Sequence, residues 1–392
     1  MTVRANKPAF SIREKLKELQ KPIGLKGSEL MRSETAQEAR DFVSAGRKNL
    51  IINGAMQVAQ RSTSATNIGL IVAYNTVDRW RFADSATSTA RFTETQSSDA
   101  PEGFGFSRKF EVTTAATTIN STDTQYTDQF IEAQDLQVLK YGTSKAESFT
   151  ISFYVKCSVA AEMGLRIQHE DGGGNYSQSY TINNANTWEY KTITVPGNTV
   201  TAINNDNGRG FRIAFPFTAG SSRAGTNSTQ WGNGDLFGAH TNDFVTTNGA
   251  TWQITGVQLE VGKNATEFQH RSYGEELALC QRYYQKNIQT SGQYTAIFTG
   301  SNYSSTTVYG TYHIQTPMRT SPTSMGYSSL SHFSIINTSG STNPNPTALG
   351  IDNGSGTQTL RVYATASGLT AGQGAFVQMN NTSAYIDFSA EL

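Results

Sequence analysis

Cysteine, charge and long apolar runs are scarce in this sequence, and each shortage excludes a class of protein. The 392 residues include two cysteines, Cys157 and Cys280, which excludes a multi-disulfide framework and leaves no zinc-ligand spacing. We expect both to be buried free thiols, with a single disulfide as the alternative. No stretch approaches the roughly 20 apolar residues that cross a bilayer, so no membrane contact is expected.

Charged side chains are also few, and their signs cancel. They make up 16% of the residues, against about 25% in an average protein. Because 31 basic residues balance 31 acidic ones, the chain lacks the basic excess of a protein that coats nucleic acid. Residues 1–10 are polar and contain no apolar segment of a secretory signal, which predicts synthesis in a cytoplasm.

Glycine and aromatic residues are what the sequence has in quantity. There are 35 Gly, 17 Tyr and 20 Phe, and Ser, Thr and Asn fill much of the rest. This composition is typical of β-rich proteins of virus particles or cell exteriors, whereas disordered chains are poor in aromatic residues. Cytoplasmic synthesis together with such a composition favours a phage structural protein, which leaves the cell by lysis.

Residues 1–48 differ from the rest by their charge and helical periodicity. They hold eleven basic and six acidic residues. Ser11 and Glu14 form a capping box before a helix that Pro22 ends, and a second helix is expected over 33–45. Neither helix is long enough to be stable alone, so we expect an anchor bound to a larger assembly; a hairpin folded on its own body is the alternative. The expected anchor residues are Ile12, Leu16, Leu19, Leu30 and Phe42.

Residues 49–274 alternate polar and apolar side chains with the period of strands. Residues 149–155, 211–217 and 252–261 follow this pattern, and the last run slips near Gly256, as a β-bulge would cause. Glycine-rich turns such as 171–175 separate the runs. Many short strands without intervening helices predict an antiparallel jelly-roll sandwich. Further strands are expected at 49–58, 78–83, 90–95 and 106–112.

A short helix is expected at 273–284, and residues 275–286 are interpreted as a helical hinge. The C-terminal part, 287–392, contains only five charged side chains and again has the pattern of strands. Its strand candidates are 307–315, 333–337, 359–365, 374–379 and 383–388. The predicted fold class is therefore mainly β: an antiparallel jelly-roll sandwich and a smaller C-terminal β domain, with a short α-helical N-terminal anchor.

Three groups of motifs stand out when residues 30–290 are considered together. The first is NLIINGAMQVAQR at 49–61, and the second is VDRW at 77–80. The third combines GVQLEVG at 256–262 with FQHRSYGEEL at 268–277. As a set they resemble the fibre and virion structural proteins of tailed bacteriophages, especially phages of marine and freshwater cyanobacteria. The resemblance implies a virion component, usually a homotrimer, with an N-terminal anchor and a distal receptor-binding tip.

A second resemblance concerns the sandwich alone. The run around Trp188 and Tyr190 before Pro196, together with 258–260, is similar to the carbohydrate-binding jelly rolls of glycanases. This resemblance implies a fold that is used to hold sugars.

No pattern in the sequence marks a catalytic centre. The five histidines lack metal-ligand spacing, and neither a nucleophile elbow nor a phosphate loop is present. Glycan hydrolysis needs two carboxylates about 5–10 Å apart, and the C-terminal domain has few acids to supply them. We expect no enzyme activity, no cofactor and no resident metal. A structural calcium ion stays open, with candidate ligands Asp171, Asp206 and Asp243.

Sugar binding has more support, because tyrosine combines a stacking face with a polar tip. The C-terminal candidates are Tyr294, Tyr303, Tyr309 and Tyr312, and the loop 231–235 adds Trp231. For each of them the alternative is structural, as cover for a sheet or a trimer interface, or as the anchor of a turn.

These observations favour a homotrimeric phage tail fibre on the particle surface. Residues 1–48 would attach it to other tail or head proteins, and the C-terminal domain would bind host-surface glycan. The alternatives are a head-decorating fibre without a receptor role and the carbohydrate-binding module of a glycan-degrading enzyme. The sequence leaves open tail or head attachment, the receptor and the copy number.

Overall fold

The computed structural model describes residue 32 and residues 49–70, 72–85, 87–232, 234, 236–289, 294–337 and 343–392. The chain divides into two compact units, Met1–Lys48 and Asn49–Leu392. Both helices expected in the first unit lie outside the described residues. So do the expected anchor residues Ile12, Leu16, Leu19, Leu30 and Phe42.

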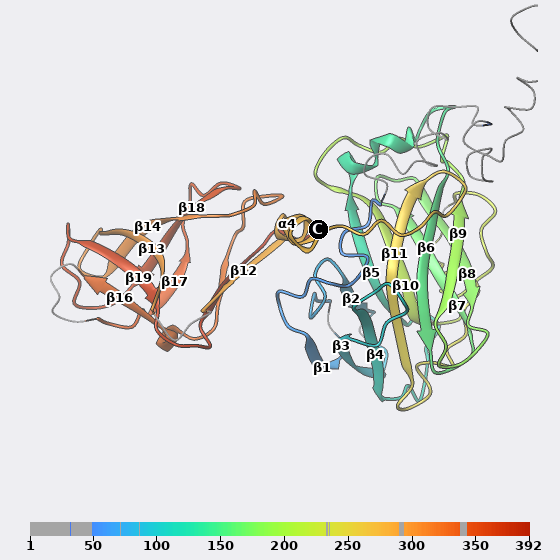
Figure 1. Cartoon of the computed structure of the whole chain (residues 1–392), viewed down its shortest axis with the longest axis horizontal. Coiled ribbons are helices and arrows are strands. Elements are labelled where there is room, and N and C mark those ends of the chain that lie inside the picture. The colour runs from blue at the N-terminus through green and yellow to red at the C-terminus, as the bar shows by residue number, and fades with distance from the viewer. Residues whose placement is uncertain are drawn as a thin grey trace, which may run out of the picture. The chain divides into compact units, whose positions relative to one another are not determined.

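The first part of the second unit is the expected antiparallel jelly-roll sandwich (Figure 1). One sheet has six strands in the order β1-β3-β4-β11-β6-β9, and the other has five in the order β2-β5-β10-β7-β8. The six-stranded sheet contains β1 (Ser64–Ile68), β3 (Arg91–Ser97), β4 (Ser107–Thr114), β6 (Phe149–Cys157), β9 (Glu189–Val195) and β11 (Thr251–Val261). The five-stranded sheet contains β2 (Arg81–Asp84), β5 (Thr124–Glu132), β7 (Glu162–His169), β8 (Gly174–Thr181) and β10 (Arg209–Ala219).

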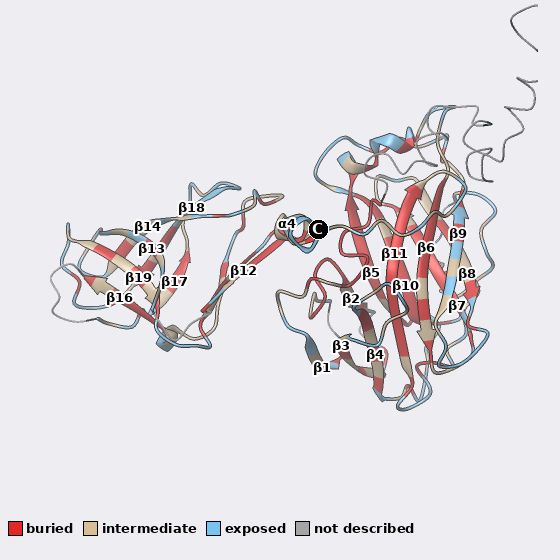
Figure 2. Cartoon of the chain, in the orientation of Figure 1, coloured by how far each residue is buried: buried red, intermediate tan, exposed pale blue. Residues whose placement is uncertain are grey.

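Period-two alternation buries one face of each sheet against the other (Figure 2). Phe149 and Phe153 of β6 are fully buried, and their rings lie 5.6 Å from Phe211 and 5.1 Å from Phe215 of β10, respectively. Burying an aromatic side chain of this size contributes about 1.5–3 kcal/mol. The same alternation turns every second residue of β6 outward, and those residues reappear below in the candidate site.

The prediction of a strand at 49–58 is wrong. The segment is buried but irregular, because Asn53 and Met56 have φ angles of 57° and 56°, which break an extended run. Its apolar side chains, including Ile51 and Val58, are nevertheless fully buried. The predicted bulge in β11 is confirmed by a register shift between Thr255 and Gln258 against β6.

A short helix follows the sandwich, as expected. Helix α4 (Tyr273–Gln281) begins with a capping box: the Ser272 hydroxyl accepts the Glu275 amide at 3.3 Å, and the Glu275 carboxylate accepts the Ser272 amide at 2.9 Å. The helix ends three residues before position 284, which was the predicted end, because Tyr284 starts the next strand.

The C-terminal part is all β and has a core of its own, with Phe298, Phe333 and Leu360 among its buried residues. A three-stranded sheet runs β12-β20-β15, and a six-stranded sheet runs β16-β19-β13-β14-β18-β17. The smaller sheet contains β12 (Tyr284–Ile288), β15 (Met325–Tyr327) and β20 (Tyr385–Ser389). The larger one contains β13 (Thr295–Asn302), β14 (Thr307–His313), β16 (Phe333–Asn337), β17 (Ala348–Ile351), β18 (Thr359–Thr365) and β19 (Gly374–Met379).

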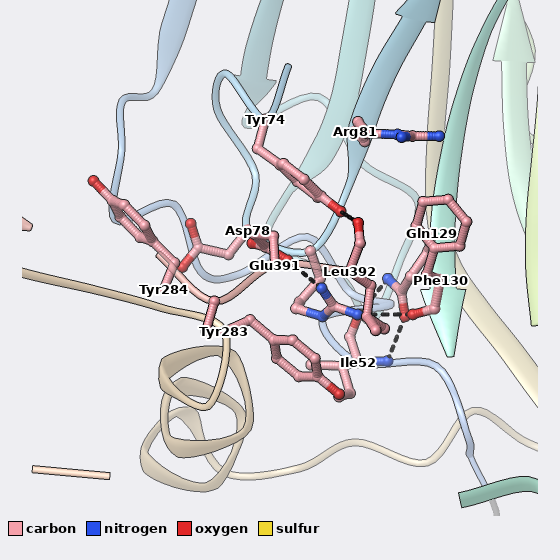
Figure 3. Close-up of polar contacts among 12 residues, drawn as sticks. Ile52, Tyr74, Asp78, Arg81, Gln129, Phe130, Tyr283, Tyr284, Glu391 and Leu392 are labelled. Atoms are coloured by element: carbon pink, nitrogen blue, oxygen red, sulfur yellow. Dashed lines mark hydrogen bonds and ion pairs between the residues drawn. The ribbon is translucent and has the colours of Figure 1, made fainter. Parts of the chain in front are cut away.

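A buried polar junction joins these parts within the second unit (Figure 3). Arg79 from the VDRW motif is ion-paired with Glu391, donates to the Phe130 carbonyl at 2.7 Å, and lies 3.4 Å from the ring centroid of Tyr283. Beside it, Leu392 packs with Phe130 and Tyr283 in a small apolar cluster. The chain's last residues therefore contact the sandwich directly.

The motif residues at 49–61 and 268–277 meet at the same junction. The backbone N–H of Asn53 donates to the Glu276 carboxylate at 2.5 Å, and Glu276 is ion-paired with Arg271 at 3.1 Å. Arg271 also donates to the Ile51 carbonyl at 3.0 Å. The residues that carry the phage-fibre resemblance thus include those that build the junction.

Both cysteines are buried free thiols, as expected. Burial raises the pKa of Cys157 to about 11 and raises the pKa of Cys280 well above its ordinary value, so both stay protonated and unreactive at neutral pH. Among the described helices, none has the length and apolar character needed to span a bilayer.

Candidate functional site: an aromatic groove over the β11 bulge

A groove of about 470 Å³ opens on the outer face of the six-stranded sheet of the sandwich. Its floor comes from β6, β9 and β11, and its walls come from two loops that are more than a hundred residues apart in sequence. The lining residues are Glu102, Gly103, Phe104, Ser152, Tyr154, Tyr190, Gly256, Ala265, Thr266, Glu267, Phe268 and His270.

The floor follows from the alternation of β6. Because Phe153 and Val155 point into the core, Ser152 and Tyr154 point out of the sheet. Tyr154 pairs directly with Tyr190 of β9, and their rings lie 4.9 Å apart. Two tyrosines therefore stand side by side on the open face, and Tyr190 leaves 46% of its surface exposed.

The bulge at Gly256 makes room for the groove's central ring. Gly256 has a φ of +63°, a conformation that glycine adopts without the steric cost other residues meet. A Cβ atom at this position would lie 2.8 Å from Phe104 and 3.1 Å from Tyr154. Both rings pack over the bare backbone of the bulge, and no larger residue fits there without moving them.

Three further rings complete one end of the groove. Phe104 lies 5.5 Å from Tyr154, 5.0 Å from Phe268 and 5.2 Å from His270, measured between ring centroids. Phe268 and His270 are 4.9 Å apart at an interplanar angle of 71°. The rings form an unbroken series from Tyr190 to His270, and their crossed planes give it a concave end.

The wall that carries Phe268 and His270 is tied to the outer face of β11. Glu260 accepts the Thr266 amide at 2.8 Å and the Thr266 hydroxyl at 2.7 Å, and Gln258 accepts the Gln269 amide at 2.8 Å. The residues 258–260 that resemble carbohydrate-binding jelly rolls therefore hold this wall in place.

The groove offers flat apolar faces together with hydroxyl and carboxylate oxygens. Small-molecule sites are typically concave, largely apolar and equipped with a few convergent polar groups. Here Ser152 and Thr266 supply hydroxyls, and Glu102 and Glu267 supply carboxylates. A sugar ring, with C–H groups on its faces and hydroxyls on its rim, matches such a lining.

Two of the predicted tyrosines come together on the C-terminal domain. Tyr303 lies 5.6 Å from Tyr309, which pairs across strands with Tyr363 at 6.3 Å. The Arg361 guanidinium lies 4.5 Å from the Tyr309 ring centroid. Tyr303, Tyr309 and Tyr363 thus form a second, smaller aromatic surface on β14, β18 and the adjoining turn.

The other predicted binding residues are placed differently. Tyr294 is 68% exposed, and the ring contacts of the described residues do not join it to Tyr303 or Tyr309. Tyr312 packs against Phe388, with ring centroids 4.9 Å apart. Trp231 stacks on Phe211 at 5.9 Å and donates its indole N–H to the Pro196 carbonyl at 2.7 Å. These contacts give Trp231 the anchoring role that was the alternative; sugar contact by these three residues stays a prediction.

Sequence reasoning missed Phe104, Tyr154, Phe268 and His270 as groove residues. Tyr154 carried a signal, since it is an aromatic residue on the polar side of an alternating strand. Phe268 and His270 lie within a motif, but the pattern gave no reason to place them beside residues 102–104. Tyr190, which belongs to the run that resembles carbohydrate-binding jelly rolls, lies in the groove.

Two of the three acidic residues considered as calcium ligands accept hydrogen bonds through their carboxylates. Asp171 accepts the Asn204 amide at 3.1 Å, and Asp206 accepts the Gly208 amide at 2.8 Å. At Asp243 the backbone carbonyl accepts the Thr247 hydroxyl at 2.8 Å, a bond that does not involve the carboxylate. Across the described ranges, no cluster of three His, Cys, Asp or Glu residues suited to a metal ion is found.

Comparison with known proteins gives only structural likenesses. No known protein family and no curated protein matches the chain. A putative sugar-binding protein from Bacteroides thetaiotaomicron shares 11% identity with a TM-score of 0.32, covering 55% of this chain and 100% of its own. The module TmCBM61, solved with β-1,4-galactotriose, shares 10% identity with a TM-score of 0.28, covering 56% of this chain and 100% of its own.

A phage protein is among the similar structures. The enzymatically active domain of bacteriophage CBA120 tailspike protein 4 shares 13% identity with a TM-score of 0.28 over 54% of this chain, and the match spans only 21% of that structure's chain. At identities and scores this low, none of these likenesses says what this protein binds.

Proposed function

We propose that this chain is a non-enzymatic fibre protein of a tailed-phage particle and that it binds cell-surface glycan. The observation that carries the binding part is the groove over Gly256, with its series of rings from Tyr190 to His270. Ring faces give a sugar apolar contact area, and the neighbouring hydroxyls and carboxylates accept its hydrogen bonds.

The remaining parts of the proposal concern assembly. Residues 1–48 attach the protein to other tail or head proteins, and three copies associate into a homotrimer at the particle surface. The tyrosine surface around Tyr309 adds a second glycan contact on each C-terminal domain. Several weak sites on one fibre bind a polysaccharide far more tightly than one site alone, because each further contact becomes intramolecular.

A glycan array probed with the full-length protein tests binding directly. The discriminating variant is Tyr190→Ala, since Tyr190 lies in the groove and is already 46% exposed, so its removal leaves the core intact. Tyr273→Ala is the matched control, because Tyr273 is 58% exposed and lies outside the groove lining. We expect the first variant to lose the array signal about tenfold and the second to keep it. Equal signals for both variants would remove the groove from the proposal.

Assembly and the absence of catalysis need separate tests. Light scattering should report a trimer, and a chain lacking residues 1–48 should stay soluble but fail to enter particles. Incorporation of the truncated chain would refute the anchor. Release of reducing ends from the bound polysaccharide would instead favour a glycan-degrading enzyme. Failure of the isolated protein to compete with phage adsorption would favour a head-decorating fibre.

A further inference from the structure

The outer face of the six-stranded sheet continues past the groove to a second cluster of aromatic and polar side chains. We propose that Trp188, Asp99 and Lys156 form a second sugar subsite there, so that the face binds several units of one oligosaccharide chain. This proposal rests on the proposed glycan binding and adds a site and the length of the ligand.

The alternation along β9 places this cluster in line with the groove floor. Tyr190 pairs with Tyr154 and faces out of the sheet, and Trp188 precedes Tyr190 by two residues, which puts it on the same side. Trp188 lies outside the groove lining. Two residues along a strand span about 7 Å, so one oligosaccharide can contact both rings.

Asp99 holds the second subsite together. Its Oδ1 accepts the indole N–H of Trp188 at 3.2 Å. Its Oδ2 accepts the Lys156 ammonium at 2.8 Å and the Gln253 side-chain amide at 3.0 Å. Asp99 belongs to the same loop as Phe104 of the groove wall. The loop therefore joins the two subsites, and its contacts fix the indole over the outer face of the sheet.

The Asp99–Lys156 pair keeps polar groups available for a ligand. The Asp99 side chain is 45% exposed and that of Lys156 is 20% exposed. A carboxylate offers about four acceptor positions and an ammonium group three N–H donors, which exceeds what the bonds above use. The Lys156 ammonium lowers the pKa of the Asp99 carboxyl, so both groups are ionised at neutral pH and their charges cancel. A donor beside an acceptor, without net charge, matches neighbouring hydroxyls of a neutral sugar.

Trp188 supplies the apolar half of the subsite. Its single N–H is bonded to Asp99, and its side chain is partly exposed beside that pair. Trp188, Tyr190 and Thr192 form one outward row along β9, which is an edge strand of the sheet. The contacts offered to a ligand thus follow a line along the strand, and a line of contacts suits a chain of sugars better than a single unit.

Chain length is the property that tests the second subsite. A glycan array carrying every backbone at two, four and six units is probed with the full-length protein. Its backbones include α-1,4-linked glucose, β-1,4-linked glucose and β-1,4-linked N-acetylglucosamine. A hexamer reaches both subsites at once, whereas a dimer occupies one. The signal of a bound backbone should therefore rise about tenfold from dimer to hexamer.

Matched variants separate a subsite from a support for the loop. Trp188→Ala should bring the hexamer signal down to that of the dimer. Trp188→Phe keeps a ring face and loses the N–H, and should recover most of the hexamer signal. Lys156→Met keeps the bond between Trp188 and Asp99 and should lower the hexamer signal several-fold. Tyr273→Ala, outside both subsites, should keep the full rise with length.

The outcomes distinguish this proposal from the function beneath it. Equal dimer and hexamer signals in the wild type would overturn the second subsite and leave glycan binding in place. So would an equal loss of both signals in Trp188→Ala, which is the result expected if Trp188 only holds the loop. A phenylalanine variant as weak as the alanine variant would overturn stacking on this ring, and an unchanged Lys156→Met would overturn the polar pair. A blank array would overturn glycan binding as well.

Discussion

Replacing Gly256 by alanine tests whether the bulge shapes the groove. The backbone there has a φ of +63°, and a left-handed conformation costs an L-residue about 1–2 kcal/mol. The added Cβ would also lie 2.8 Å from Phe104 and 3.1 Å from Tyr154, a degree of overpacking that costs about 1–3 kcal/mol. Gly256→Ala should therefore lower the free energy of unfolding by about 2–5 kcal/mol and push Phe104 into the groove.

Gly249 provides a matched control. Its φ is +76°, and nothing lies within 4 Å of the position a Cβ would take. Gly249→Ala should therefore lower the free energy of unfolding by the backbone contribution alone, about 1–2 kcal/mol. This variant should bind glycan like the wild type.

Urea denaturation followed by tryptophan fluorescence measures this difference in the intact chain. The protein has four tryptophans, and all of them lie at 80–252, within the sandwich. The midpoint should fall further for Gly256→Ala than for Gly249→Ala, and only the former should lose glycan binding. If the two variants were equally stable and both bound glycan fully, the account of the groove's construction would be refuted.

Three further predictions concern the junction and the C-terminal surface. Burial raises the pKa of Asp78 from 3.8 to about 6, so its stabilising contribution is complete below about pH 4 and is lost as the pH rises through 6. Between pH 4 and pH 7, the free energy of unfolding of the wild type should fall by up to about 3 kcal/mol more than that of Asp78→Asn, as measured by thermal melts. Glu391→Gln leaves the fully buried Arg79 without its anion and should lower the free energy of unfolding by about 3–5 kcal/mol in urea titrations. Adding Arg79→Met removes the unpaired charge and should restore most of that stability. Alanine at both Tyr309 and Tyr363 should leave the melting temperature of the sandwich unchanged but weaken retention on immobilised host polysaccharide several-fold, measured by surface plasmon resonance.

Local alternation predicted the strands where one face is apolar and the other polar. The expected strands 333–337, 359–365 and 374–379 coincide with β16, β18 and β19, and the bulge in β11 lies where the apolar period slips. Helix α4 likewise follows from its own sequence. In these elements the residues that decide the structure are neighbours in the chain.

The same reasoning fails where burial does not follow polarity. Residues 49–58 are apolar but fold irregularly around Asn53, whose side-chain amide donates to the carbonyls of Val58 and Asp78. Glu94 and Arg108 point into the sandwich core as a fully buried ion pair, with Arg108 Nε donating to Glu94 at 2.9 Å. A polarity pattern assigns such residues to the solvent side.

The groove was beyond prediction for a topological reason. Its rings come from a loop at 102–104, from two paired strands and from a segment at 265–270, and only the order β4-β11-β6-β9 brings them together. The segment 268–271 also serves two sites, because Phe268 and His270 face the groove while Arg271 bonds to the junction. A change at the junction is therefore expected to reach the groove through one short stretch of backbone.

The most direct test of the central claim is the glycan array with the full-length protein and its Tyr154→Ala, Tyr190→Ala double variant. The account predicts a defined set of bound glycans for the wild type and their loss in the double variant, with the fold unchanged by circular dichroism. An identical set of bound glycans for both proteins would contradict the claim that this groove is the binding site.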